Sequence, residues 1–147
     1  MADDGAGIME KNIQGMISGG KINLMILIVS MPVGGVENQV LSIVQRLNRV
    51  KYNTTICCIK EQGALGEKAA CIGIKVMALN LMKSSRFSLS IPRQISGVLK
   101  ENNIDILWTH QYVANQYGRM AAILAGTRAV VSTFHALYDK PKRHRSL

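Results

Sequence analysis

The stretch that decides the fold is Ile22-Asn23-Leu24-Met25-Ile26-Leu27-Ile28-Val29, followed by the turn Ser30-Met31-Pro32-Val33-Gly34-Gly35. An apolar run of this length is typical of a central strand that is buried on both faces. After the turn, apolar residues recur at helical spacing, at Val36, Val40, Ile43, Val44 and Leu47. The stretch therefore predicts a strand, a glycine-containing turn and a helix, which together form the start of a βαβ unit.

The same alternation continues to residue 133. Further strands are expected at 54–59, 74–79, 105–109 and 128–133, with helices at 65–72, from Ser90 onward, and along the small residues Ala114, Gly118, Ala121 and Ala125. Gly73 and Gly126 follow the ends of two of these helices. Short connections between alternating strands and helices require right-handed crossovers and a parallel sheet. The sequence predicts an α/β fold, a Rossmann-like doubly wound parallel sheet with strand order 3-2-1-4-5.

Composition agrees with one globular domain. The chain has 147 residues, of which 48% are apolar, 18% charged and only 5% aromatic, so we expect an aliphatic core. Residues 1–20 are glycine-rich and weakly patterned; we expect a loose leader there and the domain at residues 21–147. The net charge of +9 favours anionic partners, although a solvated basic surface without any partner gives the same charge.

The cysteines Cys57, Cys58 and Cys71 lack the spacing of a zinc site. We expect them to be reduced and buried, as is usual in the cytoplasm. The apolar run Leu24–Val29 is too short to span a bilayer, and the acidic start lacks the pattern of a secretory signal. These features predict a cytoplasmic protein and leave open a peripheral contact with the inner face of the membrane.

Functional residues are expected at the carboxyl ends of the strands, because ligands of open α/β sheets bind where the strand order reverses. The connections there are Ser30–Gly35, Thr109–Gln111 and Ser132–His135. Two of the three histidines, His110 and His135, fall in these segments. A neutral imidazole at a strand end accepts a proton or bonds a hydroxyl near pH 7. The alternative is a ring that only bonds loop backbone.

The Gly34-Gly35 pair opens a helix. Glycines there expose backbone N–H groups at the positive end of the helix dipole, which suits a phosphate or a hydroxyl. The same pair also serves as a simple tight turn. Glu37, in the first turn, complements the dipole or accepts a substrate hydroxyl. The pattern is neither GxGxxG nor a P-loop, and no GxSxG nucleophile elbow is present.

Three segments together resemble a known family. They are Gly34-Gly35-Val36-Glu37, then Thr109-His110-Gln111-Tyr112-Val113-Ala114-Asn115 with Gly118-Arg119, then Val131-Ser132-Thr133-Phe134-His135. In order and spacing they resemble the N-terminal domain of family 4 glycosyltransferases, and the resemblance runs from about Lys21 to the end of the chain.

The resemblance implies a GT-B architecture, in which two Rossmann-like domains face a cleft, and a retaining transfer that needs no metal or other cofactor besides the nucleotide-sugar co-substrate. This domain would hold the sugar or lipid-linked acceptor, and a C-terminal domain would hold most of the donor. His135 would be the catalytic residue that contacts donor sugar or acceptor. The substrate-binding residues would be Gly34, Gly35, Glu37, His110, Asn115, Arg119 and Thr133.

The chain departs from the family pattern in its extent. The donor-binding domain, with its paired glutamates and its Lys/Arg for the diphosphate, has no counterpart in the sequence. Even the first domain lacks a further helix and strand after the basic tail at residues 140–147. We therefore expect a natural truncation or a fragment of a hexosyl-type glycosyltransferase that is inactive alone and needs the missing domain in cis or in trans.

Two other function classes stay open. A non-catalytic binding module with the same fold would dock a partner or an anionic membrane surface. Lys83, Arg86, Arg93 and Lys100 flank a helix whose other face is apolar, which suits a membrane, although a solvated basic face has the same composition. Nucleic acid is disfavoured because no basic-aromatic strand motif, zinc finger or helix-turn-helix is present.

Overall fold

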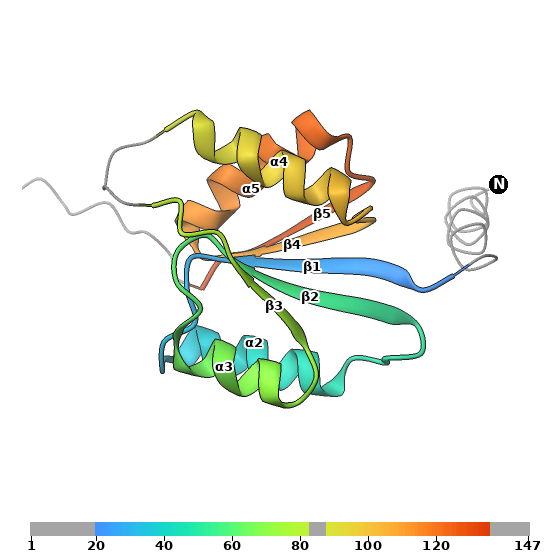
Figure 1. Cartoon of the computed structure of the whole chain (residues 1–147), viewed down its shortest axis with the longest axis vertical. Helices are drawn as coiled ribbons and strands as arrows, with labels where there is room; N and C mark the ends of the chain where they lie inside the picture. Colours follow the sequence, from blue (N-terminus) through green and yellow to red (C-terminus); the bar gives the residue numbers. More distant parts are fainter. Residues whose placement is uncertain (1–19, 83–87, 136–147) are drawn as a thin grey trace, which may run out of the picture.

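The computed structural model describes residues 20–82 and 88–135. Five strands and four helices alternate along these residues (Figure 1). In chain order they are β1 (Ile22–Ile28), α2 (Gly35–Arg46), β2 (Tyr52–Cys58), α3 (Gly63–Cys71), β3 (Lys75–Ala78), α4 (Ser90–Glu101), β4 (Ile106–His110), α5 (Tyr112–Ala125) and β5 (Ala129–Thr133).

The strands form one sheet in the order β3-β2-β1-β4-β5, and every pair is parallel, as predicted. Strand limits differ from the predicted ones by one or two residues. β2, for example, begins at Tyr52 rather than Thr54 because Tyr52 and Asn53 pair with Ile22 and Asn23 of β1. The reversal of strand order thus lies between β1 and β4.

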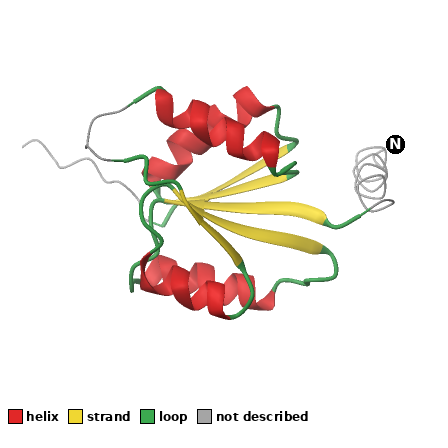
Figure 2. Ribbon diagram, in the orientation of Figure 1, coloured by secondary structure: helices red, strands yellow, loops and turns green. Residues whose placement is uncertain are grey.

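Helices cover both faces of the sheet, α2 and α3 on one side and α4 and α5 on the other (Figure 2). The central strand divides its side chains between the two layers. Met25 and Leu27 belong to the core under α4 and α5, whereas Ile26 and Ile28 belong to the core under α2 and α3. All four are fully buried. This two-sided burial explains why residues 24–28 of β1 form a continuous apolar run instead of an alternating one.

The predicted stripe of small residues brings α5 close to the sheet. Ala114, Gly118 and Ala121 are buried, and Ala125 is partly buried against the same core. A Cβ atom at Gly118 would collide with the methyl group of Thr109 on β4. The helix therefore lies at a distance that only glycine permits at this position.

The cysteine prediction holds for two residues and is wrong for the third. Cys57 and Cys58 are fully buried in β2, and burial raises the pKa of both thiols to about 12, so neither is a nucleophile at neutral pH. Cys71 is exposed because it is the last residue of α3 and lies outside the helix face that packs on the sheet.

β5 is at the edge of the sheet within the described ranges, as expected, and Val130 and Val131 on it are exposed. None of the helices in the described part of the chain is long and apolar enough to cross a membrane. Several sequence features lie outside the described residues, namely all but the last residue of the expected leader 1–20, the basic residues Lys83 and Arg86, and the tail at 140–147.

Candidate functional site

The carboxyl ends of β1, β4 and β5 lie together at one end of the sheet, which we call the carboxyl edge. Leu27 pairs with Thr109 across β1 and β4, and His110 pairs with Thr133 across β4 and β5. Helices α2 and α5 start directly beyond this edge (Figure 1). The structure thus brings the three predicted segments next to one another, as the topology requires.

Glu37 and Gln111 join two of these segments. The Gln111 Nε2 group donates a hydrogen bond of 2.7 Å to Glu37 Oε1, and Gln111 Oε1 accepts one of 3.4 Å from the backbone N–H of Val29. Glu37 is buried, with 7% of its surface exposed, which is unusual for a carboxylate. The carboxylate therefore does more than complement the dipole of α2: it is fixed at the edge of the sheet.

The two glycines of the predicted pair differ in their surroundings. A Cβ atom at Gly34 would overlap the Glu37 carboxylate, whereas one at Gly35 would have no atom within 4 Å. The Gly34 backbone carbonyl also accepts a 2.8 Å hydrogen bond from Asn38 Nδ2. Gly34 is thus the residue that makes room for Glu37, and Gly35 only begins the helix.

Gln111 has a backbone conformation that residues other than glycine rarely adopt. Its φ and ψ angles are 73° and 154°. Such a conformation costs about 1–3 kcal/mol and persists where surrounding contacts enforce it. The two hydrogen bonds of the Gln111 side chain are contacts of that kind. Gln111 therefore links the strained backbone before α5 to the buried carboxylate of Glu37.

His110 is the last residue of β4 and is fully buried, whereas the sequence placed it in a loop. Its Nδ1 atom lies 3.1 Å from His135 Nε2, and the two rings are stacked with centroids 5.3 Å apart. The Trp108 ring lies 5.1 Å away. Burial, with a smaller contribution from His135, lowers the pKa of His110 from 6.5 to about 4, so the ring is neutral at pH 7.

Asn115 is buried at the start of α5 and donates a 3.1 Å hydrogen bond from Nδ2 to the Thr133 carbonyl. The Thr133 hydroxyl accepts a 2.8 Å bond from Trp108 Nε1. Asn115 Oδ1 and His110 Nε2 are buried and have no hydrogen-bond partner among the described residues. Buried polar atoms of this kind are rare and often mark a place for water or a ligand.

Arg119 belongs to a second group of contacts, between α5 and β5. Its Nε atom donates to the Ser132 hydroxyl at 3.3 Å, and the guanidinium lies 5.5 Å from the centre of the exposed Phe134 ring. Ser132 also accepts a 2.9 Å bond from Thr109 Oγ1. Arg119 therefore contacts β5 through Ser132, while its own side chain stays exposed.

Sequence reasoning did not single out Gln111, Trp108 or Ser132 as site residues. Gln111 belongs to one of the three segments that resemble the family, but a glutamine in the sequence does not indicate a positive φ angle. Its position directly before α5, at the reversal of strand order, was the one available signal.

Within residues 20–82 and 88–135, no three His, Cys, Asp or Glu side chains are grouped so as to hold a metal ion.

The comparisons with known proteins agree with this architecture. The sequence pattern of Glycosyltransferase Family 4 matches residues 33–147. No curated protein matches the chain. Among solved structures, the fold is similar to the glycosyltransferase from Rickettsia africae ESF-5, with a TM-score of 0.57 and 16% identity over 82% of this chain. The chain spans 32% of that protein's length. The chain belongs to Glycosyltransferase Family 4.

Proposed function

We propose that this domain is the acceptor-binding half of a retaining glycosyltransferase of GT-B architecture, which takes a sugar from a nucleotide-sugar donor. A second domain would hold most of the donor, so the chain by itself would not transfer sugar. Family membership and the parallel sheet support a glycosyltransferase module. The short span relative to the solved structure is consistent with the two-domain part of the proposal.

One observation carries the proposal: hydrogen-bond donors and acceptors lie close together at the carboxyl edge. Glu37 supplies a buried carboxylate, His135 a partly exposed imidazole, and Asn115 an unsatisfied amide oxygen. Sugar hydroxyls donate and accept at once, so they are best bound by mixed groups of this kind. In this arrangement the backbone of Gly34 and Gly35 lies near the sugar. His110 and Thr133 support the site through their contacts with His135 and Asn115.

The charge at this edge favours a neutral sugar over a nucleotide diphosphate. The Glu37 carboxylate is buried and would repel a diphosphate at close range. Arg119 already donates to Ser132 and lies against Phe134. In this proposal another domain supplies cations for the donor phosphates, because transfer needs both substrates positioned together.

A transfer assay with the isolated chain tests this proposal. The chain is incubated with radiolabelled UDP-glucose, UDP-N-acetylglucosamine or GDP-mannose and with monosaccharide or polyprenyl-phosphate acceptors. We expect no sugar transfer and no release of nucleotide above the buffer rate. Sustained transfer by the purified chain alone would show that it holds a complete active site and would overturn the acceptor-half assignment.

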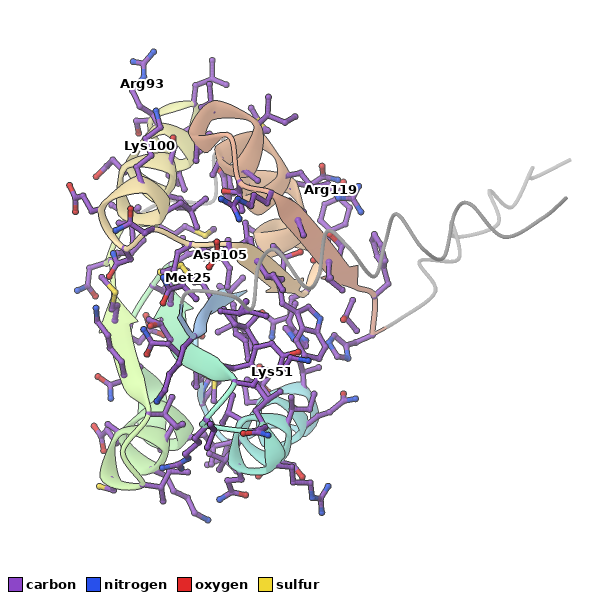
Figure 3. The ribbon with its side chains drawn as sticks, turned by 90° about the vertical axis from the view of Figure 1, so that its right-hand side faces the viewer. Met25, Lys51, Arg93, Lys100, Asp105 and Arg119 are labelled. Atoms are coloured by element: carbon purple, nitrogen blue, oxygen red, sulfur yellow. The ribbon has the colours of Figure 1, made fainter. Side chains whose placement is uncertain are left out.

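A second candidate function, docking on an anionic membrane, is favoured by a groove between α4 and α5. The groove holds about 380 Å³ and is lined by Leu89, Pro92, Arg93, Met120, Ile123 and Leu124. Leu89, Ile123 and Leu124 are exposed, which is uncommon for neighbouring apolar side chains. Figure 3 shows Arg93 and Lys100 on α4, with Arg93 directed away from the body of the molecule. Apolar side chains beside cations suit an anionic lipid surface.

Vesicle sedimentation separates this candidate from a solvated basic face. We expect binding to phosphatidylglycerol vesicles and little binding to phosphatidylcholine vesicles. Arg93→Glu combined with Ile123→Ser should weaken binding about tenfold. Lys68→Glu, a charge reversal at an exposed residue of α3, is the control and should change binding far less. Equal losses in both variants would indicate a general charge effect and remove the docking surface.

A further inference from the structure

We propose that His110 is a positioning residue that fixes the tautomer of His135, so that His135 presents its Nδ1–H group to the substrate as a hydrogen-bond donor. The inference rests on the proposed function in one respect, namely that His135 is the ring that faces the substrate. It concerns the direction of one hydrogen bond, from His110 Nδ1 to His135 Nε2, which are 3.1 Å apart.

The burial of His110 limits the choice of protonation states. The ring is fully buried beside Trp108 and His135, and its pKa is lowered to about 4. At neutral pH it therefore carries one N–H group, either on Nδ1 or on Nε2. When each ring carries a single proton, the 3.1 Å contact has two possible directions. In one, His110 Nδ1–H donates to His135; in the other, His135 Nε2–H donates to His110.

The surroundings of the His110 Nε2 atom favour one of these two directions. This atom is buried and has no partner among the described residues. If His135 were the donor, His110 would carry its proton on Nε2, as a buried N–H without an acceptor. If His110 Nδ1–H is the donor, Nε2 is only an unfilled acceptor. Orphaned buried N–H groups are the rarer of the two in native proteins, so the second arrangement is favoured.

The tautomer of His135 follows from this direction. Its Nε2 atom accepts the bond from His110, so when this ring carries a single proton, that proton is on Nδ1. Free histidine prefers the opposite tautomer, with the proton on Nε2, so the buried partner imposes the state. His135, which is only partly buried, then offers an N–H donor to a hydroxyl or phosphate oxygen. It does not offer a free lone pair, and a role as general base is disfavoured.

Nitrogen chemical shifts of the imidazole rings test this proposal directly. Two-bond ¹H–¹⁵N spectra are recorded for the chain at pH 7.5, with the third ring identified by His144→Gln. We expect both His110 and His135 to be protonated on Nδ1. A His135 ring protonated on Nε2 would overturn the proposal. The measurement needs no sugar transfer, so its outcome is independent of the transfer assay above.

Two substitutions of His110 separate positioning from packing. His110→Asn keeps an amide N–H close to the position of Nδ1, and we expect His135 to stay protonated on Nδ1. His110→Phe fills the space without a donor, and His135 should revert to the Nε2–H form. An unchanged His135 tautomer in His110→Phe would contradict the proposal. If His110→Phe does not fold, the parent spectrum and His110→Asn still decide, because loss of the Nδ1–H form in His110→Asn would also count against it.

Discussion

Gln111 Nε2 and Glu37 Oε1 are joined by a hydrogen bond of 2.7 Å, which ties the residue before α5 to the first turn of α2. Gln111 directly follows β4, and Glu37 lies in the helix that follows β1; these are the strands between which the sheet reverses its order. The bond holds a carboxylate in place at the point where ligands of this fold bind. It also helps to hold the strained backbone of Gln111.

Substitution of Gln111 by Gly and by Ala measures that strain. Both variants lose the side-chain hydrogen bonds, but glycine adopts φ 73° and ψ 154° without a steric cost. Gln111→Gly should therefore be more stable than Gln111→Ala by about 1 kcal/mol, despite the usual entropic disadvantage of glycine. Urea unfolding gives the comparison. Equal stability, or a more stable Ala variant, would mean that the backbone is unstrained.

The tight approach of α5 to the sheet predicts a sharp difference between two glycines in helices. Gly118→Ala would place a methyl group against Thr109 and 3.0 Å from Leu27 Cδ2, so it should cost about 1–3 kcal/mol of unfolding free energy. Gly97→Ala in α4 meets no atom within 4 Å and should gain about 0.5–1 kcal/mol. Thermal or urea unfolding checks both. A tolerated Gly118→Ala would show that α5 packs more loosely.

Gly34 and Gly35 provide a second matched pair. A methyl group at Gly34 would displace the Glu37 carboxylate and break its bond with Gln111, at a cost of about 1 kcal/mol. At Gly35 the space is open, and Ala should be neutral or slightly stabilising. Unfolding curves report the cost, and the amide signal of Gln111 reports the displacement. The same Gln111 shift in both variants would argue against a specific role of Gly34.

Burial of neutral His110 predicts a loss of stability in weak acid. The pKa of His110 is lowered to about 4, below its ordinary value of 6.5. Between these values the unfolded chain binds a proton that the native protein does not bind, so stability falls as pH decreases from about 6.5 to about 4. The loss approaches roughly 3 kcal/mol at the acid end, and nothing is lost above pH 7.

His110→Asn removes this titration and is the matched comparison. The difference in unfolding free energy between the parent and His110→Asn should change by a few kcal/mol between pH 7 and pH 4.5, because carboxylate titrations are common to both. A constant difference over that range would mean that His110 is protonated in the native protein as easily as in the unfolded chain.

The architecture could be predicted from the sequence because local signals and chirality suffice for it. The run Ile22–Val29 indicates burial on both faces, and short alternating connections leave few topologies. The gathering of the segments around Gly34, His110 and His135 followed from the topology alone. These are properties of the backbone path, which pattern and handedness determine.

The details of the site could not be predicted because they depend on contacts distant in sequence. Glu37 is separated from its partner Gln111 by 74 residues, so the sequence left open whether it complements the helix dipole or binds a ligand. The sequence alone predicts a loop at His110, because the burial of this residue comes from its contacts with Trp108 and with His135, which lies two residues beyond β5. The exposure of Cys71 likewise depends on which face of α3 packs on the sheet.

The acceptor-half proposal requires the carboxyl edge of β1, β4 and β5 to bind a sugar and not a nucleotide. The most direct measurement is a titration of the ¹⁵N-labelled chain with N-acetylglucosamine, glucose and mannose and, separately, with UDP and GDP. We predict that at least one sugar, at millimolar concentration, shifts the amide signals of Gly34, Gln111 and His135, that Gln111→Ala weakens this response, and that the nucleotides leave these amides unchanged. Shifts of the same amides by UDP or GDP, with no response to any sugar, would contradict the account.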